Sequence, residues 1–158
     1  MAELKDIEKL LESGNVDGAL QLADDVKNRE KLIITLNDYA VFLAKEELDL
    51  EDVEKLLKKV VELKPEMPEA YYNLGCLYSE PELLAEDEQT LRKAIESFEK
   101  ALELKPDYLD ARYDLGLLYA FTGQKGKALM EYDKLLEFDP QNIGKYDRLE
   151  GLIKSLAD

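Results

Sequence analysis

A short motif that occurs twice constrains the fold of this chain more than any other feature. The segments YNLGCLY at 72–78 and YDLGLLY at 113–119 share Tyr, Leu-Gly, Leu and Tyr at the same positions, and their starts lie 41 residues apart. Self-similarity at a period of about 20–50 residues is typical of repeat architectures, in which each unit buries its apolar face against its neighbours. The sequence therefore predicts a stack of small units.

The units are predicted to be helical. Apolar residues recur at helical spacing through almost the whole chain, for example over 56–61, and no segment shows the alternation of a strand. Proline closes three of these runs, in ELKP at 62–65, ELKP at 103–106 and EFDP at 137–140. Because proline cannot continue the hydrogen bonds of a helix, each marks a helix end. We expect an all-α fold of about nine helices, at 2–12, 16–28, 31–46, 50–64, 68–80, 88–104, 108–122, 125–138 and 143–156.

The two copies of the motif share further positions downstream. Both continue with alanine, then an aromatic residue four positions later, and finally proline, which resembles the tetratricopeptide repeat pattern W-x2-L-G-x2-Y…A-x3-F…P of a 34-residue helix–turn–helix unit. Arg112 departs from the aromatic residue that opens this pattern. The matching residues are Leu74, Gly75, Tyr78, Ala94, Phe98, Ala101 and Pro106 in the first copy, and Leu115, Gly116, Tyr119, Ala128, Tyr132 and Pro140 in the second.

The glycines of the pattern need a packing reason. Glycine inside a helix costs about 0.5–1 kcal/mol relative to alanine. We expect Gly75 to face Ala94 and Gly116 to face Ala128, so that the two helices of each repeat approach closely while the aromatic rings fill the remaining volume.

Earlier repeats follow from spacing. A step of 34 back from Pro68 reaches a degenerate repeat at 34–67, in which Ala40-Val41 replaces Leu-Gly. Gly14 lies 109 residues before Gly123, which equals two steps of 34 and one of 41. The resemblance thus implies one domain, a right-handed superhelical solenoid of antiparallel helix pairs. Its parts are a partial repeat at 1–33, the degenerate repeat at 34–67, repeats at 68–108 and 109–142, and an amphipathic capping helix at 143–158.

The repeat at 68–108 carries seven extra residues between its two helices, because the motif spacing is normal on both sides. Ser79-x-x-Glu82 resembles a capping box, and Pro81 would then lie in the first turn of a short helix. Either Leu83 and Leu84 fold back over the helix pair, or the insertion at 79–90 contacts a partner.

Composition excludes several function classes. The chain has 36 Asp and Glu against 21 Lys and Arg, for a net charge of −15, so it lacks the clustered basic surface that nucleic acid requires. No run approaches the roughly 18 apolar residues of a membrane span, and the N-terminus lacks an apolar signal region. We expect a cytoplasmic protein without nucleic-acid or membrane partners.

Catalytic and metal chemistry are poorly represented. The chain has no histidine, and Cys76 is its only cysteine, so the common triads, a multi-cysteine metal site and an internal disulfide are excluded. No phosphate-binding or dinucleotide-binding glycine motif occurs. We expect a non-enzyme without cofactor or metal, in which Cys76 acts as a small apolar residue.

The resemblance implies a protein-interaction module whose first helices line the concave face of a groove. For the aromatic candidates, packing between repeats remains an alternative. Mapped by register, the groove-facing candidates are Asp38, Tyr39 and Phe42; Tyr72, Asn73 and Cys76; and Asp110, Tyr113, Asp114, Leu117 and Phe121.

Some family members use Lys, Asn and Arg on these helices to hold the C-terminal carboxylate of a chaperone. Here Asp38, Asp110 and Asp114 stand at the cation positions and would repel a carboxylate. We expect a basic peptide or protein partner with apolar anchors, bound by a monomer or weak homodimer. The alternative is a self-association module that pairs with a second copy.

Overall fold

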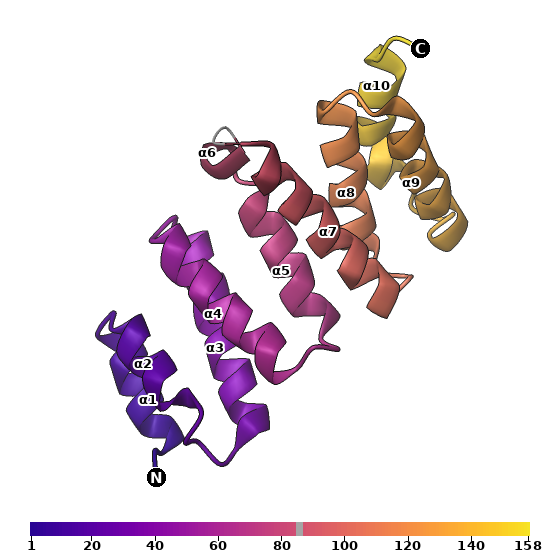
Figure 1. The fold of residues 1–158 in the computed structure, drawn as a ribbon. Coiled ribbons are helices and arrows are strands. Elements are labelled where there is room, and N and C mark those ends of the chain that lie inside the picture. The colour runs from indigo at the N-terminus through magenta and orange to yellow at the C-terminus, as the bar shows by residue number, and fades with distance from the viewer. Residues whose placement is uncertain (85–86) are drawn as a thin grey trace. The chain divides into compact units, whose positions relative to one another are not determined.

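The protein is all-α, as the sequence predicts. A computed structural model describes residues 1–84 and 87–158, without the side chains of Glu82 and Leu84, so the predicted capping box and the packing of Leu84 lie outside the described part. Every element in that part is helical (Figure 1). The elements are α1 (Leu4–Glu12), α2 (Val16–Ala23), α3 (Arg29–Lys45), α4 (Leu50–Leu63), α5 (Pro68–Tyr78), α6 (Pro81–Leu84), α7 (Glu88–Leu104), α8 (Leu109–Phe121), α9 (Lys125–Phe138), the 3-10 helix η1 (Ile143–Tyr146) and α10 (Asp147–Ser155).

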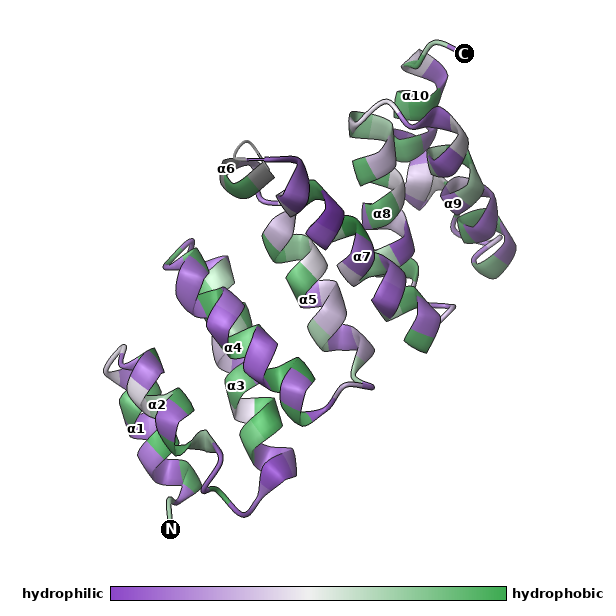
Figure 2. Cartoon of the chain, viewed as in Figure 1, coloured by the Kyte–Doolittle hydropathy of each residue, from purple (hydrophilic) through white to green (hydrophobic). Residues whose placement is uncertain are grey.

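The chain divides into two compact units, Met1–Leu77 (unit 1) and Tyr78–Asp158 (unit 2). In unit 1, α1 pairs with α2 and α3 with α4, while α1 also contacts α3 and α2 contacts α4. The first helices of the two pairs therefore lie side by side, as do the second helices. Apolar residues alternate with polar ones around α4, in keeping with one buried face (Figure 2). The core of unit 1 includes Ile7, Leu11, Ala19, Leu32, Leu36, Ala40, Val53, Leu56, Leu57 and Val60.

Unit 2 is built around the hairpin of α8 and α9. Helix α7 packs on α8, α6 contacts α7, and α10 contacts both α8 and α9. The helix α10 is thus placed beside α8 as α3 is placed beside α1, and it closes this unit. The largest fully buried side chains of unit 2 are Phe98, Leu115, Leu135 and Leu149.

The same turn joins the two helices within three of the helix pairs. Gly14 and Gly123, which the sequence comparison paired, both have φ of 76°, and Glu47 has φ of 52°. In each turn this residue donates its backbone N–H to the carbonyl three residues earlier, and the next residue donates to the carbonyl five residues earlier, as in a Schellman motif. Glycine adopts this left-handed conformation at low cost, whereas Glu47 adopts it with steric strain.

The α3–α4 turn contains one additional residue, which shifts the register expected for the degenerate repeat. Leu48 lies between Glu47 and the α4 N-cap Asp49, whereas Gly14 and Gly123 directly precede the N-caps of their second helices. Ala40 lies seven residues before Glu47, as Gly116 lies seven residues before Gly123. Ala40, fully buried, therefore occupies the glycine position, and the expected match of Ala40-Val41 to Leu-Gly was one residue out of register.

Two helix boundaries differ from expectation. The predicted helix 16–28 ends at Ala23, because Asp24 and Asp25 place carboxylates at the negative end of the helix dipole. The Arg29 side chain donates to the carbonyl of Asp24 at 3.0 Å, and the Asn28 side chain caps α3. The predicted helix 143–156 begins as η1, and α6 begins at Pro81 as expected.

Gly116 has a neighbour that was not predicted. A Cβ atom at this position would lie 2.8 Å from Leu149 Cδ2 on α10 and 3.4 Å from Glu131 Cβ on α9. The glycine therefore makes room for the closing helix as well as for α9, and the closing helix was not part of the expectation.

Arg112 fills the aromatic position of the motif as a buried ion pair. Its Nη1 lies 2.6 Å from Glu131 Oε2, and its Nη2 donates to the carbonyl of Pro106 at 2.6 Å. The guanidinium carbon lies 5.5 Å from the centre of the Phe138 ring. Arginine thus keeps the packing role of an aromatic residue and adds polar ties between α8 and α9.

Candidate functional site

Two tyrosines in unit 2 have raised pKa values because their hydroxyl groups are buried against carboxylates of other segments. Burial and a hydrogen bond to Asp139 raise the pKa of Tyr146 to about 12, with further contributions from the charges of Asp139 and Asp110. Burial and the hydrogen bond to Glu99 likewise raise the pKa of Tyr119.

Within residues 1–84 and 87–158 there is no group of three or more potential metal ligands, and no helix long and apolar enough to cross a bilayer.

A pocket of about 370 Å³ lies between the first helices of unit 1, and we call it the α1–α3 pocket. Three of its lining residues were predicted from the sequence, namely Asp38, Tyr39 and Phe42. The α1 residues were not predicted, although Glu8, Leu11 and Glu12 lie three and four residues apart along the chain and so share one face of that helix. The complete lining is Glu8, Leu11 and Glu12 from α1, with Thr35, Asp38, Tyr39 and Phe42 from α3.

Two aromatic rings form one wall of the α1–α3 pocket. The ring centres of Tyr39 and Phe42 lie 5.8 Å apart with an interplanar angle of 37°. The Tyr39 hydroxyl donates to the carbonyl oxygen of Leu11 at 2.5 Å, which ties α3 to α1. Phe42 is 50% exposed. Tyr39 therefore holds the two helices together, while Phe42 offers an apolar surface to solvent.

The carboxylates of the α1–α3 pocket form no ion pair within the described residues. Glu8, Glu12 and Asp38 are exposed, and in the described part of the chain no Lys or Arg nitrogen lies within 4.0 Å of them. The pocket therefore combines an aromatic wall with carboxylates that are not engaged in ion pairs among the described residues.

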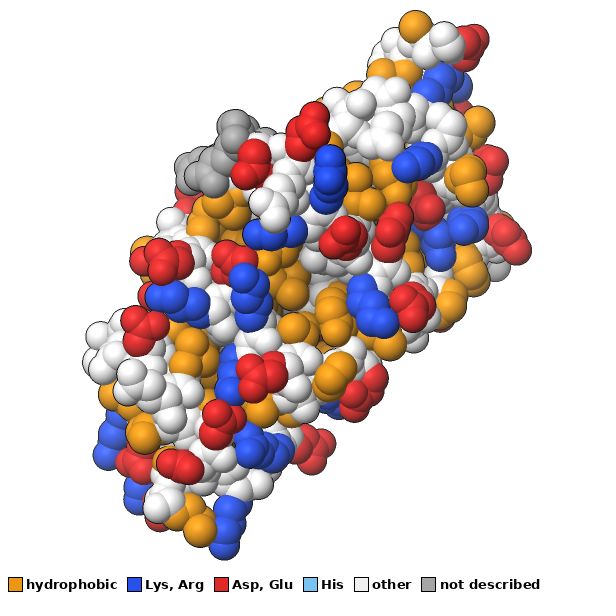
Figure 3. All heavy atoms as spheres, in the orientation of Figure 1, with side chains coloured by type: hydrophobic (Ala, Val, Ile, Leu, Met, Phe, Trp, Pro, Cys, Tyr) orange, Lys and Arg blue, Asp and Glu red, His pale blue; other side chains and the backbone are white. Residues whose placement is uncertain are grey.

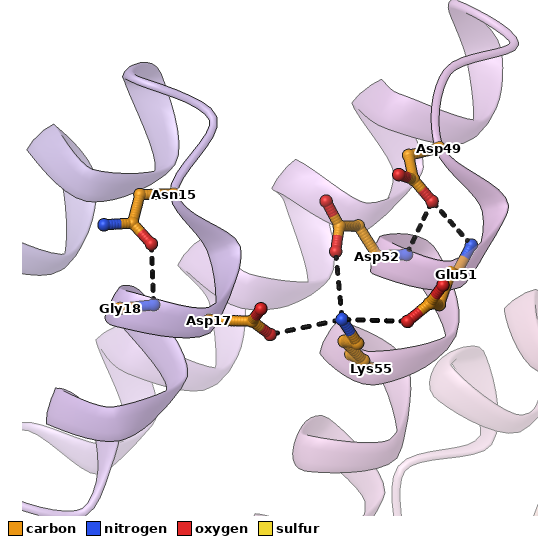
Figure 4. Close-up of polar contacts among 7 residues, drawn as sticks. All are labelled: Asn15, Asp17, Gly18, Asp49, Glu51, Asp52 and Lys55. Carbon is orange, nitrogen blue, oxygen red and sulfur yellow. Dashed lines mark hydrogen bonds and ion pairs between the residues drawn. The ribbon is translucent and has the colours of Figure 1, made fainter.

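The second helices of unit 1 have the opposite character. Lys55 lies 3.2 Å from Asp17, 3.1 Å from Glu51 and 3.6 Å from Asp52, and these carboxylates converge on its amino group in Figure 4. The hydrogen bonds to Glu51 and Asp17 raise the pKa of Lys55. Figure 3 shows basic and acidic side chains side by side on the visible face of unit 1. Charge is thus largely paired along α2 and α4.

The candidates on α5 are partly buried. Asn73 Nδ2 donates to Asn37 Oδ1 of α3 at 3.1 Å, so this side chain links two first helices within unit 1. Tyr72 and Cys76 are half-buried. A second pocket of about 380 Å³, which the sequence did not predict, lies at the opposite end of α3. It is lined by Glu30, Ile33, Ile34, Leu63, Lys64, Glu66 and Met67.

In unit 2 the closing segment contacts the candidate face of α8. The ring of Tyr113 lies 5.7 Å from that of Tyr146 in η1. Phe121 is 61% exposed, and the guanidinium of Arg148 in α10 lies 5.7 Å from its ring centre. Asp110 is exposed, whereas Asp114 and Leu117 are half-buried. This face therefore already has aromatic and cationic neighbours from its own chain.

Comparisons with known proteins agree with these helix pairs. Residues 85–153 match the sequence model of the tetratricopeptide repeat family. This match and the helix pairs identify tetratricopeptide repeats in that part of the chain. No curated protein matches the chain.

Several solved structures resemble this chain. The first TPR of Spaghetti (RPAP3), bound to the HSP90 peptide SRMEEVD, has a TM-score of 0.66 at 17% identity, over 80% of this chain and 94% of that chain. MamA has a TM-score of 0.60 at 29% identity, over 94% and 80%. TTC0263, a thermophilic TPR protein of Thermus thermophilus, has a TM-score of 0.52 at 20% identity, over 96% and 97%.

Proposed function

We propose that this protein is an interaction module that binds a peptide or protein segment on the first helices of its helix pairs. The bound segment carries basic residues between apolar anchors. The α1–α3 pocket is the observation that carries the proposal. Its exposed Phe42 ring offers an apolar contact, and its unpaired carboxylates favour positive charge.

The peptide in the RPAP3 structure sharpens the proposal by contrast. That peptide, SRMEEVD, has three acidic residues against one arginine. In the present chain Asp38, Asp110 and Asp114 stand where the family's cation positions were mapped. Like charges at a desolvated contact cost binding energy, so an acidic tail is a poor ligand here.

A net charge of −15 disfavours nucleic acid as a partner. We propose an adaptor of the cytoplasm that works without cofactor or catalysis, as a monomer or weak homodimer.

Selection from a random peptide library on the immobilised protein tests this function. Peptides that combine Lys or Arg with aromatic or aliphatic residues should be enriched. They should lose affinity with Phe42→Ala and keep it with Leu48→Ala, a control that removes an apolar side chain of similar exposure outside the pocket. Absence of enrichment, or enrichment of acidic peptides, would contradict the proposal.

Self-association is the second candidate function, and exposed apolar side chains in unit 2 favour it. Leu129 and Met130 of α9 and Ile143 of η1 are 43%, 58% and 49% exposed. Sedimentation equilibrium of the wild type and of Met130→Glu separates the candidates. A dimer that dissociates in the variant would favour self-association, whereas a monomer at all concentrations would exclude it.

A further inference from the structure

The α1–α3 pocket has the size and the surfaces to hold one long side chain. Its volume of about 370 Å³ lies near the lower end of the roughly 300–1,000 Å³ range of small-ligand sites. Leu11, Tyr39 and Phe42 supply apolar contacts, while Glu8 and Glu12 contribute carboxylates from α1. An aliphatic stem that ends in a cation matches both kinds of surface.

Two phenylalanine rings of unit 2 have a guanidinium over them, whereas the other cations found over rings are lysines on tyrosines. Phe121 at the end of α8 has the guanidinium of Arg148 at 5.7 Å from its ring centre, and Phe138 has that of Arg112 at 5.5 Å. Phe42 is half-exposed and has only the Tyr39 ring as an aromatic neighbour, with no cation over it in the described part of the chain.

The Arg112 site also combines an aromatic ring with a carboxylate. Its guanidinium lies 2.6 Å from Glu131 and faces the ring of Phe138. The α1–α3 pocket likewise combines an aromatic ring with carboxylates, the two kinds of group that hold the guanidinium of Arg112. Asp38 supplies negative charge from α3, on the same helix as Phe42, so a guanidinium could contact both.

We infer that the α1–α3 pocket is the subsite that recognises one arginine side chain of the bound segment. The stem lies along Leu11 and Phe42, and the guanidinium is held among Glu8, Glu12 and Asp38. Arginine fits better than lysine because its planar head stacks on aromatic rings and forms paired hydrogen bonds with carboxylates. This inference rests on the proposed function and adds the position and identity of the basic residue.

Titration with amino-acid amides tests the subsite without a known partner. N-acetyl-arginine amide should shift the NMR signals of Phe42 and Asp38, whereas N-acetyl-citrulline amide, a neutral molecule of nearly the same shape, should not at equal concentration. N-acetyl-lysine amide should give smaller shifts than the arginine compound. Equal shifts with citrulline would overturn the recognition of charge, and equal shifts with lysine would overturn the choice of arginine.

Two double variants separate the pocket from the general charge of the protein. Glu12→Gln with Asp38→Asn should weaken arginine amide binding by about tenfold or more, because the hydrogen bonds to the guanidinium are no longer charge-assisted. Glu46→Gln with Glu47→Gln removes the same charge from exposed positions outside the pocket and should change binding less than about twofold. Equal losses in both variants would assign the effect to the overall field and overturn the inference.

The two proposals fail in different ways. Selected peptides that need Phe42 but bind equally well after Arg→citrulline replacement would leave the interaction function standing and overturn the arginine subsite. If arginine amide binds at Phe42 but no peptide is enriched, the subsite is supported and the interaction function is contradicted.

Discussion

The first helices of the two units differ in what covers them. In unit 1, α1 and α3 leave a pocket whose carboxylates form no ion pair within the described residues. In unit 2, the face of α8 is contacted by η1 and α10, which supply Tyr146 against Tyr113 and Arg148 against Phe121. A position on a first helix therefore does not by itself make a binding residue. The side chains of the following helix decide whether that face is available.

The largest predicted effect comes from opening the covered face of unit 2. Leu149 is fully buried, and its Cδ2 lies where a Cβ on Gly116 would clash. Leu149→Ala should lower the free energy of unfolding by about 2–5 kcal/mol, because it removes a well-packed side chain and leaves a cavity. Chemical denaturation measures the loss, and hydrogen exchange should place it in α8 and α10.

Leu152→Ala on the same helix is the control for this prediction. Leu152 is half-buried, so the loss should be clearly smaller. Equal losses in the two variants would contradict the role assigned to the Leu149–Gly116 contact.

The contacts that cover α8 also predict that the free energy of unfolding falls at alkaline pH. The pKa of Tyr146 is raised to about 12 in the folded protein, above the value of about 10 for an unfolded chain. The neutral phenol is therefore favoured by folding, and its contribution is complete below pH 10 and is lost as the pH rises towards 12. The loss from this residue should reach at most about 2–3 kcal/mol.

Denaturation of wild type and Tyr146→Phe across this pH range tests the prediction. The variant should lose less stability between pH 10 and 12, although Tyr119, whose pKa is also raised, leaves part of the slope. An unchanged slope in Tyr146→Phe would show that this hydroxyl is not buried against Asp139.

The fold could be predicted further than the site. The Leu-Gly motif and the prolines placed most helix ends within a few residues because both act locally on the backbone. The covering of Tyr113 by Tyr146 could not be predicted, since helical periodicity does not say which helices become neighbours. The same reason hid Glu8 and Glu12, whose role as pocket residues depends on the contact between α1 and α3.

A reciprocal exchange of N-caps tests whether the two units share one helix-start geometry. Asn15 has φ −89° and ψ 71° and accepts a hydrogen bond from the backbone of Gly18 at 2.9 Å. Gln124 has φ −87° and ψ 65° but makes no side-chain cap. Gln124→Asn should stabilise the protein by about 1 kcal/mol, and Asn15→Gln should destabilise it by a similar amount.

Thermal and chemical denaturation of the two single variants measure these shifts. The double variant should be close to neutral, because the two expected shifts are similar in size and opposite in sign. A destabilising Gln124→Asn would mean that α9 does not begin with the geometry of α2.

The smallest predicted effect concerns the turn that recurs in both units. Glu47 has φ of 52°, where Gly14 and Gly123 have 76°. A non-glycine residue in this region costs about 1–2 kcal/mol, and glycine lowers stability by about 0.5–1 kcal/mol through the unfolded chain. Glu47→Gly should therefore stabilise unit 1 by about 0.5–1 kcal/mol, whereas Gly123→Ala should destabilise unit 2 by about 1 kcal/mol.

Glu46→Gly is the control, at the neighbouring C-cap of α3. It should not stabilise the protein, because φ there is −82° and glycine relieves no strain. If Glu47→Gly were no better than Glu46→Gly, the turn of unit 1 would not share the left-handed geometry of unit 2.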